Sequence, residues 1–436
     1  MKLELASFPV NNVRFGKSTN YNNGVLQIHQ DELLALLLKD KRITGVTLDL
    51  GFPNDETRIV NIRDVVQPIV KVSGPGCVFP GIVGPVETAG RGRTHKLSGI
   101  AVIPTAHYRS KRKSGGGAQN IGILDMWGPG SLVTHLGSTI NVVLMLKLMD
   151  DLDELEAEAA ILKAECVAAQ YLAESTRHIR PEKVEVFELF EVDSSLPRVV
   201  YILGFVTNAT EAHSGVTYYG MQVKDSLPTF IHPNEILDGA LTTDARKGRG
   251  IAPMTWGWMN NPVVLGLYKE HGKRLNFLGV ILQKTRFESE FGKQVLAAST
   301  SQLASLLRAN GAIITRTEPS GNNMIDVMLT IQACERRGIK TVHVGPEWGG
   351  RDGTEVPLVF TLPEADAIVT TGSMDRVTKV PAPKKVIGLE KDQRTVTMHE
   401  GDEPIHPWNE LILDNGGEIP QSIYYFGEMN YTCKGY

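Results

Sequence analysis

Cysteine is scarce in this sequence, and the few cysteines do not stand at paired spacings. Cys77, Cys166, Cys334 and Cys433 form no CxxC motif, and no cluster has the spacing of a metal site. We therefore expect no metal centre. Cys166 and Cys334 stand beside Ala and Leu in helical patterns, so we predict that both are thiols of the core.

Long apolar runs are also missing. The segment MKLELASFPV at the start of the chain has neither the apolar stretch nor the cleavage site of a signal peptide. No stretch approaches the roughly 20 apolar residues of a membrane helix. The formal net charge is only −4, which excludes a bulk attraction to nucleic acid or to an anionic membrane. We predict a soluble cytoplasmic protein without nucleic-acid or membrane partners.

Several common catalytic motifs are absent as well. The sequence has no GxGxxG, no lysine-containing phosphate-binding loop, no HExxH and no nucleophile elbow. A stand-alone hydrolase or lyase would need an activated nucleophile, and none is visible. That class of enzyme therefore ranks last among the functions that we consider.

The composition that remains is typical of a globular protein with a large core. The chain has 436 residues, of which 42% are hydrophobic and 22% charged. The first hundred residues read as strands and turns. After about residue 260 strands alternate with helices, which predicts a parallel sheet. The expected strands are 278–283, 311–315, 340–344, 366–371 and 385–388, and the expected helices are 291–309 and 323–337.

The predicted fold class is α/β, with a β-rich mixed domain followed by a doubly wound, mostly parallel α/β domain. We place the first domain at residues 1–240, a connecting loop at 241–262 and the Rossmann-like domain at 263–395. A C-terminal tail, 396–436, follows. Ligands on doubly wound sheets bind at the carboxyl ends of strands, so the loops there are the first candidates for a site.

Two groups of residues in the first domain suggest chemistry. Arg91 and Arg93 flank a glycine and are followed by His95, which suits anion binding and proton transfer. A surface turn is the alternative. Glu235 and Asp238 stand three residues apart and can share one face of a helical turn as acid and base. A capped loop that connects domains is the alternative for this pair.

Two further groups follow strands of the second domain. Glu347, Arg351 and Asp352 lie in a glycine-rich loop after the strand at 340–344, where backbone N–H groups can point at an anion. The alternative is a turn with an internal ion pair. Gly321 and Asn322 open the next helix and offer free N–H donors, unless they only cap it.

Taken in order, several segments resemble the component B proprotein subunit of glycine/sarcosine/betaine reductase. The resemblance covers roughly residues 1–395, and an ordered set of motifs is far more specific than any one of them. The matching segments are 79–81 (FPG) with 91–95 (RGRTH), 124–129 (LDMWGP), 228–240 (PTFIHPNEILDGA), 260–273 (NNPV and LYKEHGK) and 347–353 (EWGGRDG).

The resemblance implies a subunit of a reductase complex that cleaves a C–N bond in an amino acid or its N-methyl derivative. In that family the proprotein cuts itself at a cysteine, which becomes a pyruvoyl group and holds the amine as a Schiff base. A partner subunit supplies the selenocysteine or cysteine that attacks the substrate carbon. D-proline reductase carries related chemistry.

This sequence departs from the family at the processing cysteine. Residues 241–259 contain neither Cys nor Ser, and the matching position falls at or near Arg246. An acyl shift needs a thiol or hydroxyl, so arginine cannot start self-cleavage, and Thr242 or Thr243 would give a different ketoacyl group. We therefore expect no pyruvoyl group and no other cofactor. The loop carries Asp244, Arg246, Lys247 and Arg249, and its three positive charges suggest an anionic group in place of the amine. A flexible surface loop is the alternative.

The favoured hypothesis is a non-pyruvoyl subunit of a component-B-like reductase in a hetero-oligomer. It would bind a small anionic or amine substrate, and a subunit containing selenocysteine or cysteine would perform the attack. Candidate catalytic residues are His95, Glu235, Asp238, Glu347 and Asp352. Candidate substrate-binding residues are Arg91, Arg93, Thr242, Thr243, Asp244, Arg246, Gly321, Asn322 and Arg351. The alternative is a structural subunit that stabilises its partner and performs no chemistry.

Overall fold

The structure is a computed structural model, and it describes most of the chain. The described residues are 1–106, 122–206, 215–223, 226–244, 253–285, 289–317, 321–347, 349–350, 358–373, 376–388, 405–414 and 418–427. Arg246, Lys247, Arg249, Arg351, Asp352 and the side chain of Asp244 lie outside them. Among the described residues, no helix has both the length and the apolar character needed to cross a membrane.

The first half of the chain is built on two sheets, as its alternating apolar pattern predicts. One sheet has the order β12 (Val184–Glu188), β1 (Lys2–Pro9), β8 (Gly92–Ser98) and β7 (Ile69–Ser73). The other has the order β10 (Gly122–Asp125), β6 (Thr57–Ile62), β9 (Ile100–Ala106), β11 (Ile140–Leu148) and β5 (Ile43–Gly51). β23 (Lys385–Ile387) pairs in parallel with β6, far from the strands that precede it in sequence.

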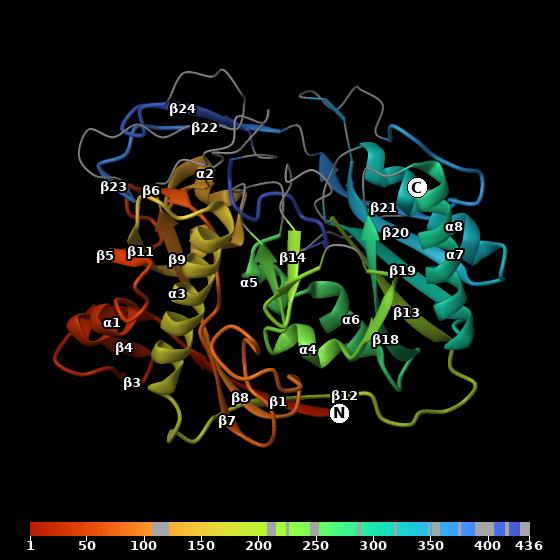
Figure 1. Cartoon of the computed structure of the whole chain (residues 1–436), viewed down its shortest axis with the longest axis horizontal. Helices are drawn as coiled ribbons and strands as arrows, with labels where there is room; N and C mark the ends of the chain where they lie inside the picture. Colours follow the sequence, from red (N-terminus) through yellow and green to blue (C-terminus); the bar gives the residue numbers. More distant parts are fainter. Residues whose placement is uncertain are drawn as a thin grey trace.

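A long helix, α3 (Glu154–Glu174), covers these sheets (Figure 1). Asp153 begins it with a capping box, since its carboxylate accepts from the backbone of Glu156 and the Glu156 side chain accepts in return. The residues buried toward the sheets recur at helical spacing, and they are mostly small. They are Ala157, Ala160, Ile161, Ala164, Ala168 and Leu172. An adjoining face of α3, which includes Ile161, Glu158 and Glu165, lines a cavity.

The second half carries the predicted doubly wound sheet. Its order is β16 (Thr229–Ile231), β18 (Asn276–Thr285), β13 (Arg198–Val206), β19 (Gly311–Arg316), β20 (Lys340–Glu347) and β21 (Ile368–Ser373), and only β16 is antiparallel to its neighbour. Side chains alternate between the two faces: Val200 and Ile202 pack with α7 (Glu290–Leu306) and α8 (Gly321–Glu335). Tyr201 and Leu203 pack on the other face, toward α6 (Pro262–Glu270).

The fold class predicted from the sequence is confirmed, and the sheet membership adds two facts. The parallel sheet includes β13 and β16, which precede residue 240, because their apolar side chains complete its two core layers. β23, expected as a strand of this sheet, instead extends the N-terminal sheet beside β6. The division of the chain into domains at residues 240 and 263 remains a prediction.

A small sheet lies between the two halves, with the order β15 (Met221–Gln222), β14 (Gly215–Tyr218) and β17 (Leu241–Asp244) (Figure 1). The other elements are β2 (Asn12–Phe15), β3 (Asn20–Asn22), β4 (Val25–Ile28), β22 (Val377–Val380), β24 (Leu411–Asp414), α1 (Gln30–Leu37), α2 (Gly128–Leu132), a 3₁₀ turn (His135–Ser138), α4 (Pro233–Leu237) and α5 (Thr255–Met259). Because β17 comes from the segment that follows the DGA motif, its surroundings bear directly on function.

Candidate functional site

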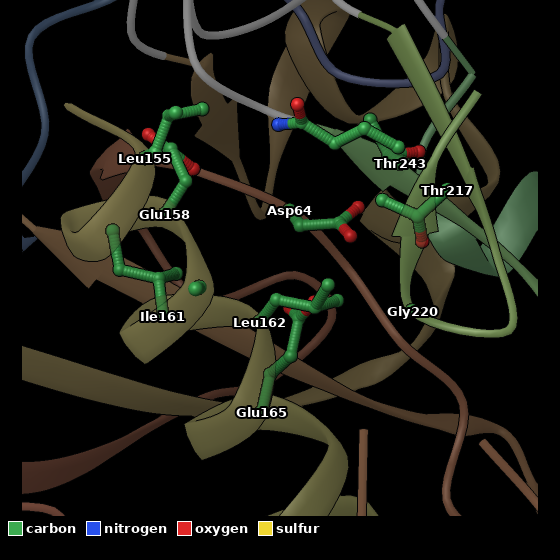
Figure 2. Close-up of a pocket in the computed structure, with 11 residues that line it drawn as sticks. Asp64, Leu155, Glu158, Ile161, Leu162, Glu165, Thr217, Gly220 and Thr243 are labelled. Carbon is green, nitrogen blue, oxygen red and sulfur yellow. The ribbon is translucent and has the colours of Figure 1, made fainter. Parts of the chain in front are cut away.

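A cavity of about 250 Å³ lies between α3 and the small central sheet (Figure 2). Its lining comes from three parts of the chain: one face of α3, the β14–β15 hairpin with β17, and the segment that follows β6. The lining residues are Asp64, Leu155, Glu158, Ala159, Ile161, Leu162, Glu165, Thr217, Gly220, Gln222 and Thr243. The cavity therefore joins segments that are far apart in sequence.

Helix geometry explains the acidic side of the cavity. Glu158 and Glu165 are seven residues apart, so they stand two turns from each other on the same face of α3. Leu155 and Leu162 share that face and make part of the wall apolar. In Figure 2 the carboxyl group of Asp64 lies between α3 and the strands that carry Thr217 and Thr243.

Asp64 is held by hydrogen bonds that favour its ionised form. Its carboxylate accepts from the Val65 backbone N–H at 2.7 Å, the Thr255 backbone N–H at 2.8 Å and the Thr255 hydroxyl at 2.5 Å. Burial raises the pKa of Asp64, while these hydrogen bonds oppose the rise. The Thr255 hydroxyl in turn accepts the backbone N–H of Thr243 at 3.0 Å, which ties β17 to Asp64.

Glu165, unlike Asp64, is buried with no described hydrogen-bond donor around its carboxyl group. Its side chain is fully buried, and neither carboxyl oxygen meets a hydrogen-bond donor among the described residues. Burial first, and the neighbouring charge of Asp64 second, raise the pKa of Glu165 well above its usual range. Burial and the nearby charge therefore favour the protonated form of Glu165, while the hydrogen bonds to Asp64 favour its ionised form.

The two threonines of β17 are already engaged. The Thr243 hydroxyl donates to the Pro253 carbonyl at 2.5 Å and accepts the indole N–H of Trp258 at 3.0 Å. The Thr242 hydroxyl is paired with that of Thr217 on β14 and is fully buried. Neither hydroxyl is poised to attack a backbone carbonyl, so these residues do not fit the precursor of a ketoacyl group.

The predicted residue His95 lies away from this cavity. Its ring packs against Phe8 at a tilt of 45°, with the ring centroids 4.7 Å apart, and its Nδ1 is 3.1 Å from the Thr176 carbonyl just after α3. Burial lowers the pKa of His95. Arg93 pairs with Glu4 on the adjacent strand at 2.7 Å, and the backbone carbonyl of Arg91 accepts from Lys71. These contacts bind β8 to its neighbours, and a catalytic role for His95 remains untested.

Asp238 connects the two residue groups predicted in the first domain. Its carboxylate is fully buried, pairs with Lys71, and accepts from the Gly90 backbone N–H at 2.8 Å and the Thr94 hydroxyl at 2.6 Å. Gly90 has a φ of +85°, and a Cβ there would come within 2.7 Å of Asn234. The RGRTH and DGA segments therefore meet at Asp238, in contacts that stabilise the fold.

Glu235 caps α4 and receives two tyrosines. Its carboxylate accepts from the Tyr218 hydroxyl at 2.6 Å, the Tyr219 hydroxyl at 2.9 Å and the His232 backbone N–H at 2.9 Å. Replacing Glu235 by glutamine makes one donor face another, so we expect the free energy of unfolding to fall by about 1–2 kcal/mol. Urea denaturation measures this. Glu191→Gln, a change at an exposed position, is the control, and an equal loss there would contradict the assignment.

The remaining described candidates lie at the carboxyl edge of the parallel sheet, as predicted. Glu347 ends β20 and Gly321 begins α8. The Asn322 carbonyl accepts from the ammonium of Lys293 at 3.2 Å, and Lys293 also pairs with Asp326 at 2.5 Å. This buried polar group is separate from the cavity beside α3, and its role in binding remains a prediction.

Asp64, Glu158 and Glu165 were not identified from the sequence. Two acids at a spacing of seven within an Ala-rich amphipathic helix are the one available signal, because an acid near the buried face of a helix is unusual. Asp64 offers no such signal, since an Asp between two apolar runs is also typical of a surface turn.

Comparison with known proteins gives consistent matches along the chain. The model of the family described as "Glycine/sarcosine/betaine reductase component B subunits" matches residues 1–404. The "Glycine reductase complex component B subunits alpha and beta" of Acetoanaerobium sticklandii is 34% identical over 394 residues, covering 89% of each chain. The "Sarcosine reductase complex component B subunit alpha" of Peptoclostridium acidaminophilum is 33% identical over 399 residues, 89% of this chain and 90% of the other.

The "Betaine reductase complex component B subunit alpha" of the same organism is 33% identical over 398 residues, covering 89% of this chain and 88% of its own length. No solved structure matches.

Proposed function

Because the chain belongs to the family of glycine/sarcosine/betaine reductase component B subunits, we propose that it binds the small substrate of a reductase complex without forming a pyruvoyl group. The family resemblance confirms the prediction made from the ordered motifs. The named relatives are subunits of reductase complexes, which supports a hetero-oligomer for this chain. The partner, a subunit with a reactive selenocysteine or cysteine, is part of the proposal.

One observation carries the assignment of the substrate site. The cavity beside α3 is lined by Thr243, three residues before Arg246, at or near which the resemblance places the family's processing cysteine. A small molecule in this cavity would therefore occupy the place that the resemblance gives to the substrate. The position at or near Arg246 has no thiol, and Thr242 and Thr243 are engaged in hydrogen bonds.

The charge of the cavity favours the amine end of a substrate. Its lining contributes Asp64, Glu158 and Glu165, and none of the described lining residues is Lys, Arg or His. A carboxylate beside a buried ammonium group compensates its charge, whereas a second anion would be repelled. The substrate would be held as an amine or ammonium compound, and the partner's thiolate or selenolate would then displace the nitrogen from carbon.

Co-purification from the native host tests this function. We expect the tagged chain to keep its full-length mass and to bring down a subunit that contains cysteine or selenocysteine at its reactive centre. Intact-mass spectrometry and partner identification measure both. Two fragments from the middle of the chain would show self-processing and restore a Schiff-base mechanism. A full-length chain that brings down no partner would contradict the complex.

A further inference from the structure

The carboxyl groups of Asp64 and Glu165 form a buried pair on the cavity floor. Asp64 is 2% exposed and Glu165 is 0% exposed, and both side chains line the same cavity, where the charge of Asp64 raises the pKa of Glu165. Two carboxylates have only acceptors, so they can hydrogen-bond to each other only when one of them carries a proton. Asp64 already accepts three hydrogen bonds, from the backbone of Val65 and from the backbone and hydroxyl of Thr255. Because these hydrogen bonds favour the ionised form of Asp64, a single proton on the pair belongs on Glu165.

The groups that face this pair offer no compensating charge among the described residues. Glu158 stands on the same helix and adds a third acid, and it raises the pKa of Glu165 further. From the central sheet come Thr217, Thr243 and Gln222, which are polar but do not titrate near neutral pH. Cys166 follows Glu165 on α3 and is fully buried. Among the described lining residues, no side chain therefore supplies a positive charge to the two acids.

A metal ion is not favoured by the same acids. Within the described residues, no group of three or more His, Cys, Asp or Glu is placed to hold a metal. Leu155, Ile161 and Leu162 of α3 also line the cavity, so part of its wall is apolar. An organic ammonium group needs just these two surfaces, since its charge meets the carboxylates and its alkyl substituents meet the leucines and isoleucine.

We propose that Asp64 and Glu165 form an ammonium receptor in which the ligand's cation replaces a proton of the empty cavity. Glu165 releases its proton to solvent when the ammonium group enters, and both carboxylates then face the cation. This inference rests on the proposed function, because it takes the cavity as the substrate site. It adds the residues that recognise the ligand and a linkage between binding and pH.

The sign of the linkage follows from the raised pKa of Glu165. Below that pKa the empty cavity holds a proton that must leave on binding, so higher pH favours the cation. The affinity is expected to rise by up to about tenfold per pH unit in this range and to level off once Glu165 is ionised in the empty cavity. A ligand that keeps its charge at every pH isolates this effect.

Isothermal titration calorimetry of the purified full-length chain with tetramethylammonium chloride tests the exchange. Titrations at one pH in two buffers with different ionisation enthalpies count the protons released, and we expect close to one per ligand. Glu165→Gln should release none and should bind at least tenfold more weakly. Glu191→Gln, which changes an exposed acid, should behave as the native chain does.

Each result bears on one part of the inference. If the native chain does not bind the probe, there is no ammonium receptor. Binding without proton release would overturn the exchange, as would an affinity that does not change between pH 6 and 8. These titrations need no partner subunit. A failure here is thus distinguishable from a failure of the reductase complex, which co-purification measures separately.

Discussion

Replacing Asp125 by alanine is expected to lower the free energy of unfolding by about 3–5 kcal/mol, because it leaves a buried guanidinium without its counter-charge. Asp125 ends β10, and its carboxylate accepts from Arg58 Nε at 2.6 Å and Nη2 at 2.9 Å. Both side chains are fully buried. Arg58 cannot lose its proton, so the remaining charge cannot be neutralised.

The same arginine attaches the last described segments of the chain to the N-terminal sheet. Arg58 donates to the carbonyls of Pro407, Asn409 and Pro381, each at 2.8 Å. Without Asp125 to orient the guanidinium, these contacts weaken together. We expect limited proteolysis to cut segments 376–388 and 405–414 earlier in the variant than in the native chain.

Urea denaturation followed by circular dichroism measures the loss. The matched control is Asp49→Ala, which removes the carboxylate of a partly exposed pair with Lys385 at 2.7 Å. Exposed pairs contribute about 0.2–1 kcal/mol, so this change should cost little. Equal losses of unfolding free energy in the two variants would show that the buried Arg58–Asp125 pair stabilises the fold no more than the partly exposed pair does. A larger loss in Asp125→Ala would give a structural role to one family motif, because Asp125 lies within the LDMWGP segment.

Replacing Ala159 by tryptophan is expected to abolish substrate turnover by the assembled complex. Ala159 is an exposed residue of α3 that lines the cavity. An indole at this position would occupy space that a small ligand needs. Because the position is exposed and helical, the free energy of unfolding should change by no more than about 1 kcal/mol. We expect affinity for tetramethylammonium to fall at least tenfold in the isolated chain.

Lys163→Trp is the control for this experiment. Lys163 stands one turn further along α3 and is also exposed, but it does not line the cavity. It should leave turnover and binding unchanged. Normal turnover by the Ala159→Trp complex would exclude the cavity as substrate site and favour a structural subunit. Loss of turnover in both variants would indicate disturbed assembly, which co-purification would detect.

The strands and helices after residue 260 follow closely from the sequence. β18, α7, β19, α8 and β20 all lie where the alternation of apolar residues predicts them. Their periodicity is local, since each element shows its own buried face within a few residues. The sequence does not predict which strands share a sheet, because pairing between strands distant in sequence leaves no local signal. β13 joins the C-terminal parallel sheet and β23 joins an N-terminal one, and neither pairing was predicted.

The absence of Cys and Ser from residues 241–259 is likewise readable from the sequence alone, since it depends only on residue identity. The position of the cavity cannot be read from the sequence. Asp64 and Glu165 meet because α3 packs across the N-terminal sheets and presents one face to β17.

The sequence by itself determined the α/β class, the family and the lack of Cys and Ser in residues 241–259, because composition, periodicity and motif order are properties of the chain. Only the tertiary structure decided which acids are chemically unusual. Asp238 and Glu235 were the obvious acids in sequence, yet their carboxylates are satisfied by Lys71, Thr94 and two tyrosines. Glu165 was not singled out from the sequence. Its pKa is raised by burial and by the charge of Asp64, and both depend on residues that are distant in sequence.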